Sequence, residues 1–286
     1  MKQLLILSGK GGTGKTTVAG AFIKLAEPKA YADCDVDAPN LHLVVTQKKE
    51  PTIRDYYGLP KAVIDKELCN SCDLCRVNCR FTAISADNGY TVDPFSCEGC
   101  GVCAAICPQK AVSLMDTVAG ELILYADDAV FSTAKLKMGS GTSGMLVTEV
   151  KKQMILEAKN ADFAIIDGSP GIGCPVIASL SGVDMVLIVT EPSVSGISDM
   201  ERIIRTAEMF QTKIAVCINK HDTNPEKTER IELYCQEKGL AFVGRIPFDP
   251  EAVKVINNNK SIIEVDCASG RAAREVYEKT IKLLQD

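Results

Sequence analysis

The sequence has no uninterrupted apolar segment of about 18 residues, the length that a membrane-spanning helix needs. It has no long run of lysine and arginine, and its formal net charge is −5, which argues against a broad nucleic-acid-binding surface. The apolar run at 4–7 gives way to glycines too soon for a secretory signal peptide. The last segment, 274–286, combines helical spacing with balanced charges, so we expect it to dock on the core. We therefore expect a cytoplasmic protein that binds neither nucleic acid nor membranes.

Histidine is scarce and cysteine is abundant. The two histidines, His42 and His221, stand alone in the sequence and are interpreted as structural. The 13 cysteines, in a chain without a signal peptide, argue against a disulfide framework, because the cytoplasm keeps thiols reduced. Reduced thiols serve as metal ligands, as redox groups or in packing. Four isolated cysteines are interpreted as core or surface residues: Cys34, Cys217, Cys235 and Cys267.

The distribution of apolar residues predicts an α/β fold. Short apolar, β-branched runs have the character of parallel strands buried on both faces, and they fall at 3–8, 29–35, 162–167, 184–190, 213–219 and 240–246. Segments with helical spacing lie at 16–27, 145–158, 198–210 and 225–238. This alternation predicts a mostly parallel sheet with helices on both faces. Residues 61–116 break the pattern, so we expect a small α+β domain inserted there into an α/β domain formed by 1–60 and 117–286.

The segment GKGGTGKT (9–16) follows a predicted strand and opens a predicted helix, which is the context of a P-loop. Its glycines allow backbone N–H groups to surround phosphate oxygens, and the helix N-terminus adds positive potential. Lys15 is expected to reach the β- and γ-phosphates of a nucleotide, and the Thr16 hydroxyl to bind Mg²⁺. The predicted nucleotide-binding residues of this segment are Gly11, Gly12, Thr13, Gly14, Lys15, Thr16 and Thr17.

Acidic residues close two of the predicted strands. Asp167 ends the strand at 162–167 and precedes GSPGIGCP, a glycine-proline loop that can respond to a γ-phosphate, so we expect Asp167 to hold the magnesium ion through water. The segment ADCDVDAPN (32–40) places Asp33, Asp35 and Asp37 after the second strand, where they suit magnesium binding and water positioning. A solvated turn is the alternative for any one of these three acids.

Lys10 adds a second lysine directly after the first glycine of the loop. The sequence KGGTGKT resembles the deviant Walker A motif of the MinD/ParA/Mrp group of P-loop ATPases, which includes the nitrogenase iron protein. The resemblance implies that Lys10 contacts the nucleotide of a dimer partner, much as an arginine finger does, and that ATP drives dimerisation. It also implies that Asp35 orients the attacking water and that Asn219 bonds adenine. The expected catalytic residues are Lys10, Lys15, Asp35 and Asp167.

The interruption at 61–116 carries two cysteine runs, CNSCDLCRVNC (69–79) and CEGCGVCAAIC (97–107), in which every cysteine recurs 28 positions later. Both follow the C-x2-C-x2-C-x3-C spacing of bacterial two-cluster ferredoxins, in which the fourth cysteine of each run binds the other [4Fe–4S] cluster. The expected ligand sets are Cys69, Cys72, Cys75 and Cys107 for one cluster, and Cys97, Cys100, Cys103 and Cys79 for the other. Residues 81–85 and 110–114 are expected as the paired short strands of a pseudo-twofold module. Two zinc sites would fit the number of cysteines but not the repeated spacing.

Taken together, these parts resemble MinD-superfamily ATPases that carry an inserted ferredoxin domain. The leading hypothesis is an ATP-binding and hydrolysing iron–sulfur protein that forms a dimer, with itself or with a paired homologue, and passes low-potential electrons to a partner protein. The alternatives are an iron–sulfur cluster carrier of the Mrp type and a positioning ATPase of the MinD/ParA kind. Cys174 lies at the offset from Asp167 at which the nitrogenase iron protein binds its cluster. Packing is the preferred interpretation of Cys174, with a bridging metal or thiol redox chemistry as alternatives.

Overall fold

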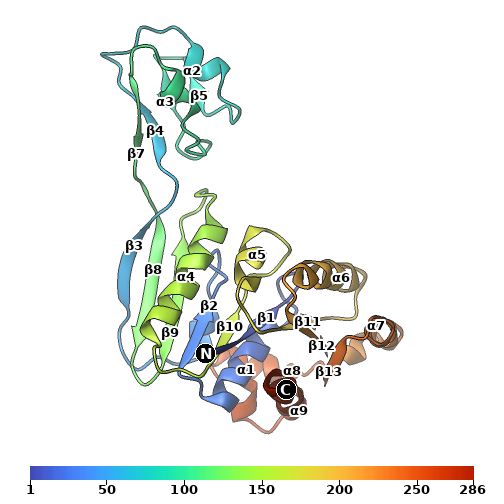
Figure 1. Cartoon of the computed structure of the whole chain (residues 1–286). Helices are drawn as coiled ribbons and strands as arrows, with labels where there is room; N and C mark the ends of the chain where they lie inside the picture. The colour runs from blue at the N-terminus through green and yellow to red at the C-terminus, as the bar shows by residue number, and fades with distance from the viewer.

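A nine-stranded sheet runs through the larger part of the molecule in the order β13-β12-β11-β1-β10-β2-β9-β8-β3 (Figure 1). The structure is a computed structural model that describes all residues, 1–286. The strands of this sheet are β1 (Lys2–Leu7), β2 (Ala30–Asp33), β3 (Thr52–Tyr57), β8 (Val118–Ala126), β9 (Val130–Leu136), β10 (Phe163–Asp167), β11 (Met185–Thr190), β12 (Lys213–Asn219) and β13 (Ala241–Ile246). Every pairing from β13 to β9 is parallel, and only β8 and β3 are antiparallel to their neighbours. The predicted mostly parallel α/β sheet is therefore confirmed.

Helices cover both faces of this sheet, as the sequence predicted. They are α1 (Lys15–Ala26), α4 (Ser143–Glu157), α5 (Cys174–Leu180), α6 (Val194–Met209), α7 (Pro225–Lys238), α8 (Pro250–Asn257) and α9 (Ala268–Gln285), with short 3₁₀ turns η1 (Leu41–Leu43), η2 (His221–Thr223) and η3 (Ile262–Glu264). Alternate residues of β1 point to opposite faces. Leu5 belongs to a core with Met200 of α6, and Leu4 to a second core with Phe22 of α1. Two hydrophobic cores thus hold the sheet between two helical layers.

A two-stranded ribbon leaves the β3–β8 edge of the sheet and carries a small unit at its end (Figure 1). Beyond β3 the chain continues into β4 (Lys61–Ile64), and β7 (Val112–Met115) leads back into β8. The pairs β3–β8 and β4–β7 are both antiparallel. The rest of the unit contains α2 (Leu74–Val77), β5 (Ile84–Ser85), β6 (Thr91–Val92) and α3 (Val102–Ile106). This small unit stands apart from the nine-stranded sheet in Figure 1.

The expected pairing of 81–85 with 110–114 is wrong. Strand β5 pairs with β6 in a short local hairpin, and β7 pairs with β4. The hairpin closes over only a few residues, which costs little loop entropy. Strand β4 continues from β3, and β7 leads back into β8, so the pairing of β4 with β7 extends the antiparallel pairing of β3 with β8.

The C-terminal helix α9 docks on the core, as expected. It contacts α1, β12, β13 and η3. The ring of Tyr277 meets the ring of Phe22 edge-on with centroids 5.1 Å apart. Val276 and Leu284 of the same helix are buried in the core that contains Phe22. None of the helices has both the length and the apolar character needed to cross a bilayer.

Candidate functional site

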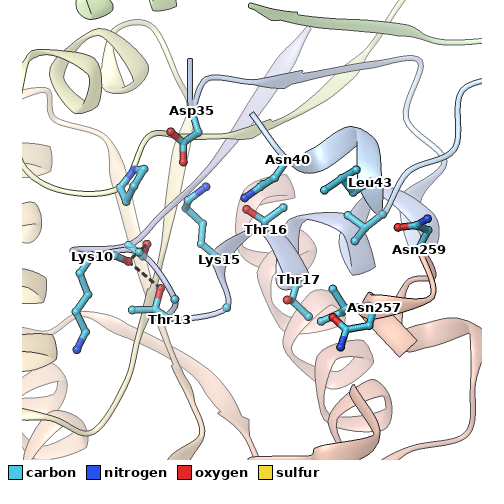
Figure 2. Close-up of a pocket in the computed structure, with 17 residues that line it drawn as sticks. Lys10, Thr13, Lys15, Thr16, Thr17, Asp35, Asn40, Leu43, Asn257 and Asn259 are labelled. Atoms are coloured by element: carbon cyan, nitrogen blue, oxygen red, sulfur yellow. Dashed lines mark hydrogen bonds between the residues drawn. The ribbon is translucent and has the colours of Figure 1, made fainter. Parts of the chain in front are cut away.

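The phosphate loop lies between the end of β1 and the start of α1, at the carboxyl edge of the parallel sheet. Gly12 and Gly14 have φ angles of 80° and 91°, in the left-handed region that favours glycine. A methyl group on Gly14 would lie 2.2 Å from Nδ2 of Asn219, so a side chain there would displace the Asn219 amide. The loop borders a cavity of about 520 Å³ (Figure 2). All seven predicted nucleotide-binding residues of 11–17 line this cavity, together with Lys10 and Asp35.

Lys15 and Asp167 form a buried ion pair beside this cavity. The Lys15 Nζ lies 2.5 Å from Oδ1 of Asp167, and both side chains are almost fully enclosed. Burial alone would lower the pKa of Lys15, but the negative charges of Asp167 and Asp33 outweigh it and raise that pKa above its ordinary value. The other carboxylate oxygen of Asp167, Oδ2, is buried and has no hydrogen-bond partner in the protein. It is a free acceptor next to the phosphate loop, suited to a water molecule or a hydrated cation.

The three acids after β2 have different surroundings. Asp33 is fully buried and accepts hydrogen bonds from the backbone N–H groups of Asp35 at 3.0 Å, Asn40 at 2.9 Å and Leu41 at 3.0 Å. Burial, with the nearby charge of Asp167, raises the pKa of Asp33 to about 7. Asp35 is half-buried and faces Lys15 in the cavity (Figure 2). Asp37 is exposed. Asp33 therefore shapes the loop, and Asp35 is the acid that a ligand in the cavity can reach.

Lys10 points away from the space that Lys15 enters (Figure 2). Its Nζ lies 2.6 Å from Oε1 of Glu191 and donates a hydrogen bond to Oγ of Ser195 at 3.0 Å. The same Glu191 lies 3.7 Å from Nζ of Lys220, which donates to the Gly12 carbonyl at 2.9 Å. Sequence reasoning assigned no role to Glu191 or Lys220. The sequence shows only that both residues are charged, because they follow β11 and β12, which are far from the phosphate loop along the chain.

Asn219 lies at a second cavity, of about 180 Å³, which shares Gly12, Gly14, Thr17 and Ile256 with the first. Residues 246–249, at the end of β13 and directly after it, line the same cavity. The side-chain amide of Asn219 donates to the Thr13 carbonyl at 2.7 Å and accepts from the N–H of the next residue at 3.0 Å. Asn219 thus holds the phosphate loop in shape, and its contact with adenine stays a prediction.

The eight cysteines of the small unit separate into two groups of four around two mostly apolar cavities. One cavity is lined by Cys69, Cys72, Cys75 and Cys107, and the other by Cys79, Cys97, Cys100 and Cys103. These are the two sets that the ferredoxin spacing predicts, including the exchange of the fourth cysteine between runs. All eight are free thiols. No group of three or more His, Cys, Asp or Glu side chains is arranged to hold one metal ion.

Backbone amides supply one donor to a sulfur in each cavity. The N–H of Ala62 points to Sγ of Cys97 at 3.5 Å, and the N–H of Ala111 points to Sγ of Cys107 at 3.3 Å. Such donors stabilise negative charge on a thiolate. Each four-cysteine group therefore has one sulfur that accepts a hydrogen bond from the backbone.

The isolated cysteines fall into two kinds. Cys34, Cys217, Cys235 and Cys267 are buried, in agreement with a packing role. Cys174 is exposed, so the preferred interpretation of Cys174 as a packed residue is wrong. It is the first residue of α5, and the loop that precedes it places it on the surface.

This fold and phosphate loop define a P-loop nucleotide-binding protein of the MinD/ParA kind. The chain belongs to the family described as the CobQ/CobB/MinD/ParA nucleotide binding domain, whose family model matches residues 4–262. The septum site-determining protein MinD of Pyrococcus horikoshii, complexed with Mg-ADP, has a similar structure with a TM-score of 0.61 and 18% identity, covering 99% of this chain and 96% of that one.

Two curated relatives cover nearly the whole chain. An uncharacterized protein of Methanocaldococcus jannaschii is 29% identical over 280 residues, which are 97% of this chain and 95% of that protein. The iron-sulfur cluster carrier protein of Pyrococcus horikoshii is 22% identical over 303 residues, covering 99% of this chain and 87% of the relative.

Proposed function

We propose that this chain binds and hydrolyses ATP, holds two [4Fe–4S] clusters, and passes low-potential electrons to a partner protein under the control of the nucleotide. In this proposal, residues 1–60 and 117–286 are the ATPase domain and 61–116 are a ferredoxin-like domain. One observation carries the proposal: Cys107 joins the first cysteine run around one cavity, and Cys79 joins the second run around the other. That exchange is a property of two-cluster ferredoxins.

The donor sets fit such clusters. In a [4Fe–4S] cluster each thiolate binds its own iron, so the four sulfurs surround a volume and need not converge on one point. A single zinc ion instead requires its sulfurs about 2.3 Å from one centre. The N–H groups of Ala62 and Ala111 favour charged sulfur over free thiol. The apolar linings would exclude water from the group that the cysteines hold. When bound, the clusters supply one-electron carrier chemistry.

In the nucleotide site, the backbone N–H groups of the glycine loop bind phosphate oxygens and Lys15 turns from Asp167 to the β- and γ-phosphates. Thr16 would hold Mg²⁺ directly, and Asp167 would hold it through water. The buried, unpartnered Oδ2 of Asp167 supports this role. Asp35 orients the attacking water, supported by its place in the cavity opposite Lys15. When Lys15 leaves Asp167 for the phosphates, the loop after Asp167 is released. In this way nucleotide binding affects the rest of the chain.

Lys10 completes the site of a second protomer. Its ammonium group points away from Lys15 and binds Glu191 and Ser195, with 36% of the side chain exposed, which supports a turn toward a second chain. Two chains that face each other across their phosphate loops would exchange their Lys10 side chains. The partner in this dimer is an identical chain or a paired homologue.

The first test of the proposal is anaerobic analysis of the purified protein. It should contain about eight irons and eight sulfides per chain and no stoichiometric zinc. Reduced protein should then transfer electrons to a low-potential acceptor faster with MgATP than with MgADP, and Lys15→Ala should lose this difference while it keeps its iron. Two zinc ions per chain, or equal rates with the two nucleotides, would contradict the proposal.

A cluster carrier is the second candidate, because a relative with nearly full coverage is named as an iron-sulfur cluster carrier protein. A carrier should transfer its clusters intact to an apo-acceptor within minutes. An electron carrier should retain them through many redox cycles. Following the iron with a labelled isotope while mixing with apo-acceptor separates the two functions.

A further inference from the structure

We propose that the two cysteine sites are unequal: the site that contains Cys97 responds to nucleotide through the glycine-rich segment 139–144, and the site that contains Cys69 does not. The inference rests on the proposed function for the identity of what the cysteines bind. The route itself depends only on contacts within this chain.

On the side of the small unit, segment 139–144 lies against the residues that flank Cys97. A methyl group on Gly139 would lie 2.9 Å from Cδ1 of Phe95, and one on Gly141 would lie 3.5 Å from Oε2 of Glu98. Gly139 has a φ of 78° and Gly141 a φ of 67°, so the segment is shaped to approach the unit closely. The loop that carries Cys97 therefore meets the ATPase domain directly.

The ribbon reinforces this contact. A methyl group on Gly99 would lie 2.1 Å from the carbonyl oxygen of Pro60, at the bend between β3 and β4. Lys61 donates a hydrogen bond from its side chain to the carbonyl of Cys97. A methyl group on Gly58, at the same bend, would lie 2.9 Å from Oγ1 of Thr142. The bend, the Cys97 loop and segment 139–144 thus form one packed junction.

On the ATPase side, the same segment leads into α4 and contacts α5. A methyl group on Gly144 would lie 3.1 Å from Cβ of Cys174 and 3.2 Å from its carbonyl oxygen. At the other end of α5, Nζ of Lys151 donates to the carbonyl of Ser179 at 2.7 Å and to that of Ser181. Helices α4 and α5 are therefore held together at both ends of α5 and move as one body.

Helix α5 follows the loop that begins at Asp167, and this loop is bonded to the phosphate loop. The N–H of Gly171 donates to the carbonyl of Ser8 at 3.0 Å. A change of partner at Asp167 displaces the start of α5, and with it α4 and segment 139–144. The contacts of Gly139 with Phe95 and of Gly141 with Glu98 then pass this displacement to the loop that carries Cys97.

The 28-residue repeat of the cysteine runs provides matched controls. Phe95 and Glu98 beside Cys97 correspond to Glu67 and Asn70 beside Cys69. All four side chains are exposed, and that of Phe95 is 72% exposed, so their truncation should leave the fold intact. The Phe95→Ala and Glu98→Ala variants test the junction, and Glu67→Ala and Asn70→Ala are the controls.

The experiment measures the affinity of the full chain for a non-hydrolysable ATP analogue with Mg²⁺, before and after reduction by dithionite. A tenfold change in affinity corresponds to about 59 mV in the potential of a one-electron group. Because coupling is reciprocal, one of the two midpoint potentials should shift with the analogue and the other should not. Phe95→Ala should abolish the shift, and Glu67→Ala should keep it. Equal shifts of both potentials, or a full shift in Phe95→Ala, would overturn the inference.

Hydrogen exchange of the same samples tests the path of contacts from the nucleotide site to the Cys97 loop independently of redox chemistry. The analogue should change the exchange of amides at 93–103 and 139–144 and leave those at 65–76 unchanged, and Phe95→Ala should remove the response at 93–103. A response at 65–76 equal to that at 93–103 would overturn the inference. Iron analysis separates the two proposals: a chain without iron contradicts the proposed function, while the exchange pattern still decides the route.

Discussion

Lys10 is held on its own chain by Glu191, and a dimer in which Lys10 acts across the interface requires this contact to break. The pair joins Nζ and Oε1 across 2.6 Å, with side chains 36% and 18% exposed. A partly exposed ion pair of this kind contributes about 0.5–1 kcal/mol. Two protomers each lose one such pair, so the cost across the dimer is about 1–2 kcal/mol, or a factor of about 5–30 in the dimer dissociation constant.

The Glu191→Gln variant removes this cost before dimerisation. Its dimer dissociation constant in MgATP analogue should be about 5–30-fold lower than that of the natural chain, as measured by sedimentation velocity over a concentration series. The control is Glu201→Gln, which neutralises an acid of α6 that pairs at 3.8 Å with Arg205 instead of Lys10. An unchanged or higher dissociation constant for Glu191→Gln would refute the reasoning, because the ion pair would then not oppose dimerisation.

Three further predictions concern the cysteines, a buried lysine and the phosphate loop. Cys79→Ser should lower the iron content from about eight to about four per chain, and its remaining EPR signal should match that of Cys100→Ser, a cysteine of the other run. Burial lowers the pKa of Lys151 from 10.5 to about 8, so the unfolded chain binds more protons between these pH values. The free energy of unfolding should therefore rise by about 3 kcal/mol over that range, and Lys151→Met should lack the rise in urea titrations. Gly14→Ala should lower MgADP affinity more than tenfold by calorimetry, because its methyl group would collide with the asparagine that ends β12. Gly89→Ala has a similar φ and open space around it, so it should leave MgADP affinity unchanged.

Local patterns in the sequence predicted most of the sheet and the phosphate loop. A strand such as β10 is buried on both faces, and its run of apolar residues is visible without knowledge of its neighbours. The P-loop glycines likewise follow from the backbone conformations that phosphate binding needs. The two cysteine groups were partly predictable for a similar reason, because three cysteines of each group lie close together in one run of the sequence.

Contacts between distant segments were not predictable in the same way. The pairing of β7 with β4 depends on where the ribbon enters the unit, and no residue in either strand encodes it alone. The roles of Glu191 and Lys220 arise because the ends of β11 and β12 are adjacent in the sheet. The exposure of Cys174 depends on the path of the preceding loop. In each case the decisive information is tertiary, and a charge or a thiol in the sequence carries no sign of its eventual neighbours.

The chain enters the small unit from β3 and leaves it into β8, two strands that pair with each other. At the edge of the sheet Tyr57 lies opposite Val118, so cutting out the residues between them leaves two ends side by side that a short turn can join. The nine-stranded sheet needs none of the excised residues to complete its pairing. The small unit can therefore be removed, or replaced by another insertion, at the point where β3 and β8 meet. The strand order of the sheet would not change.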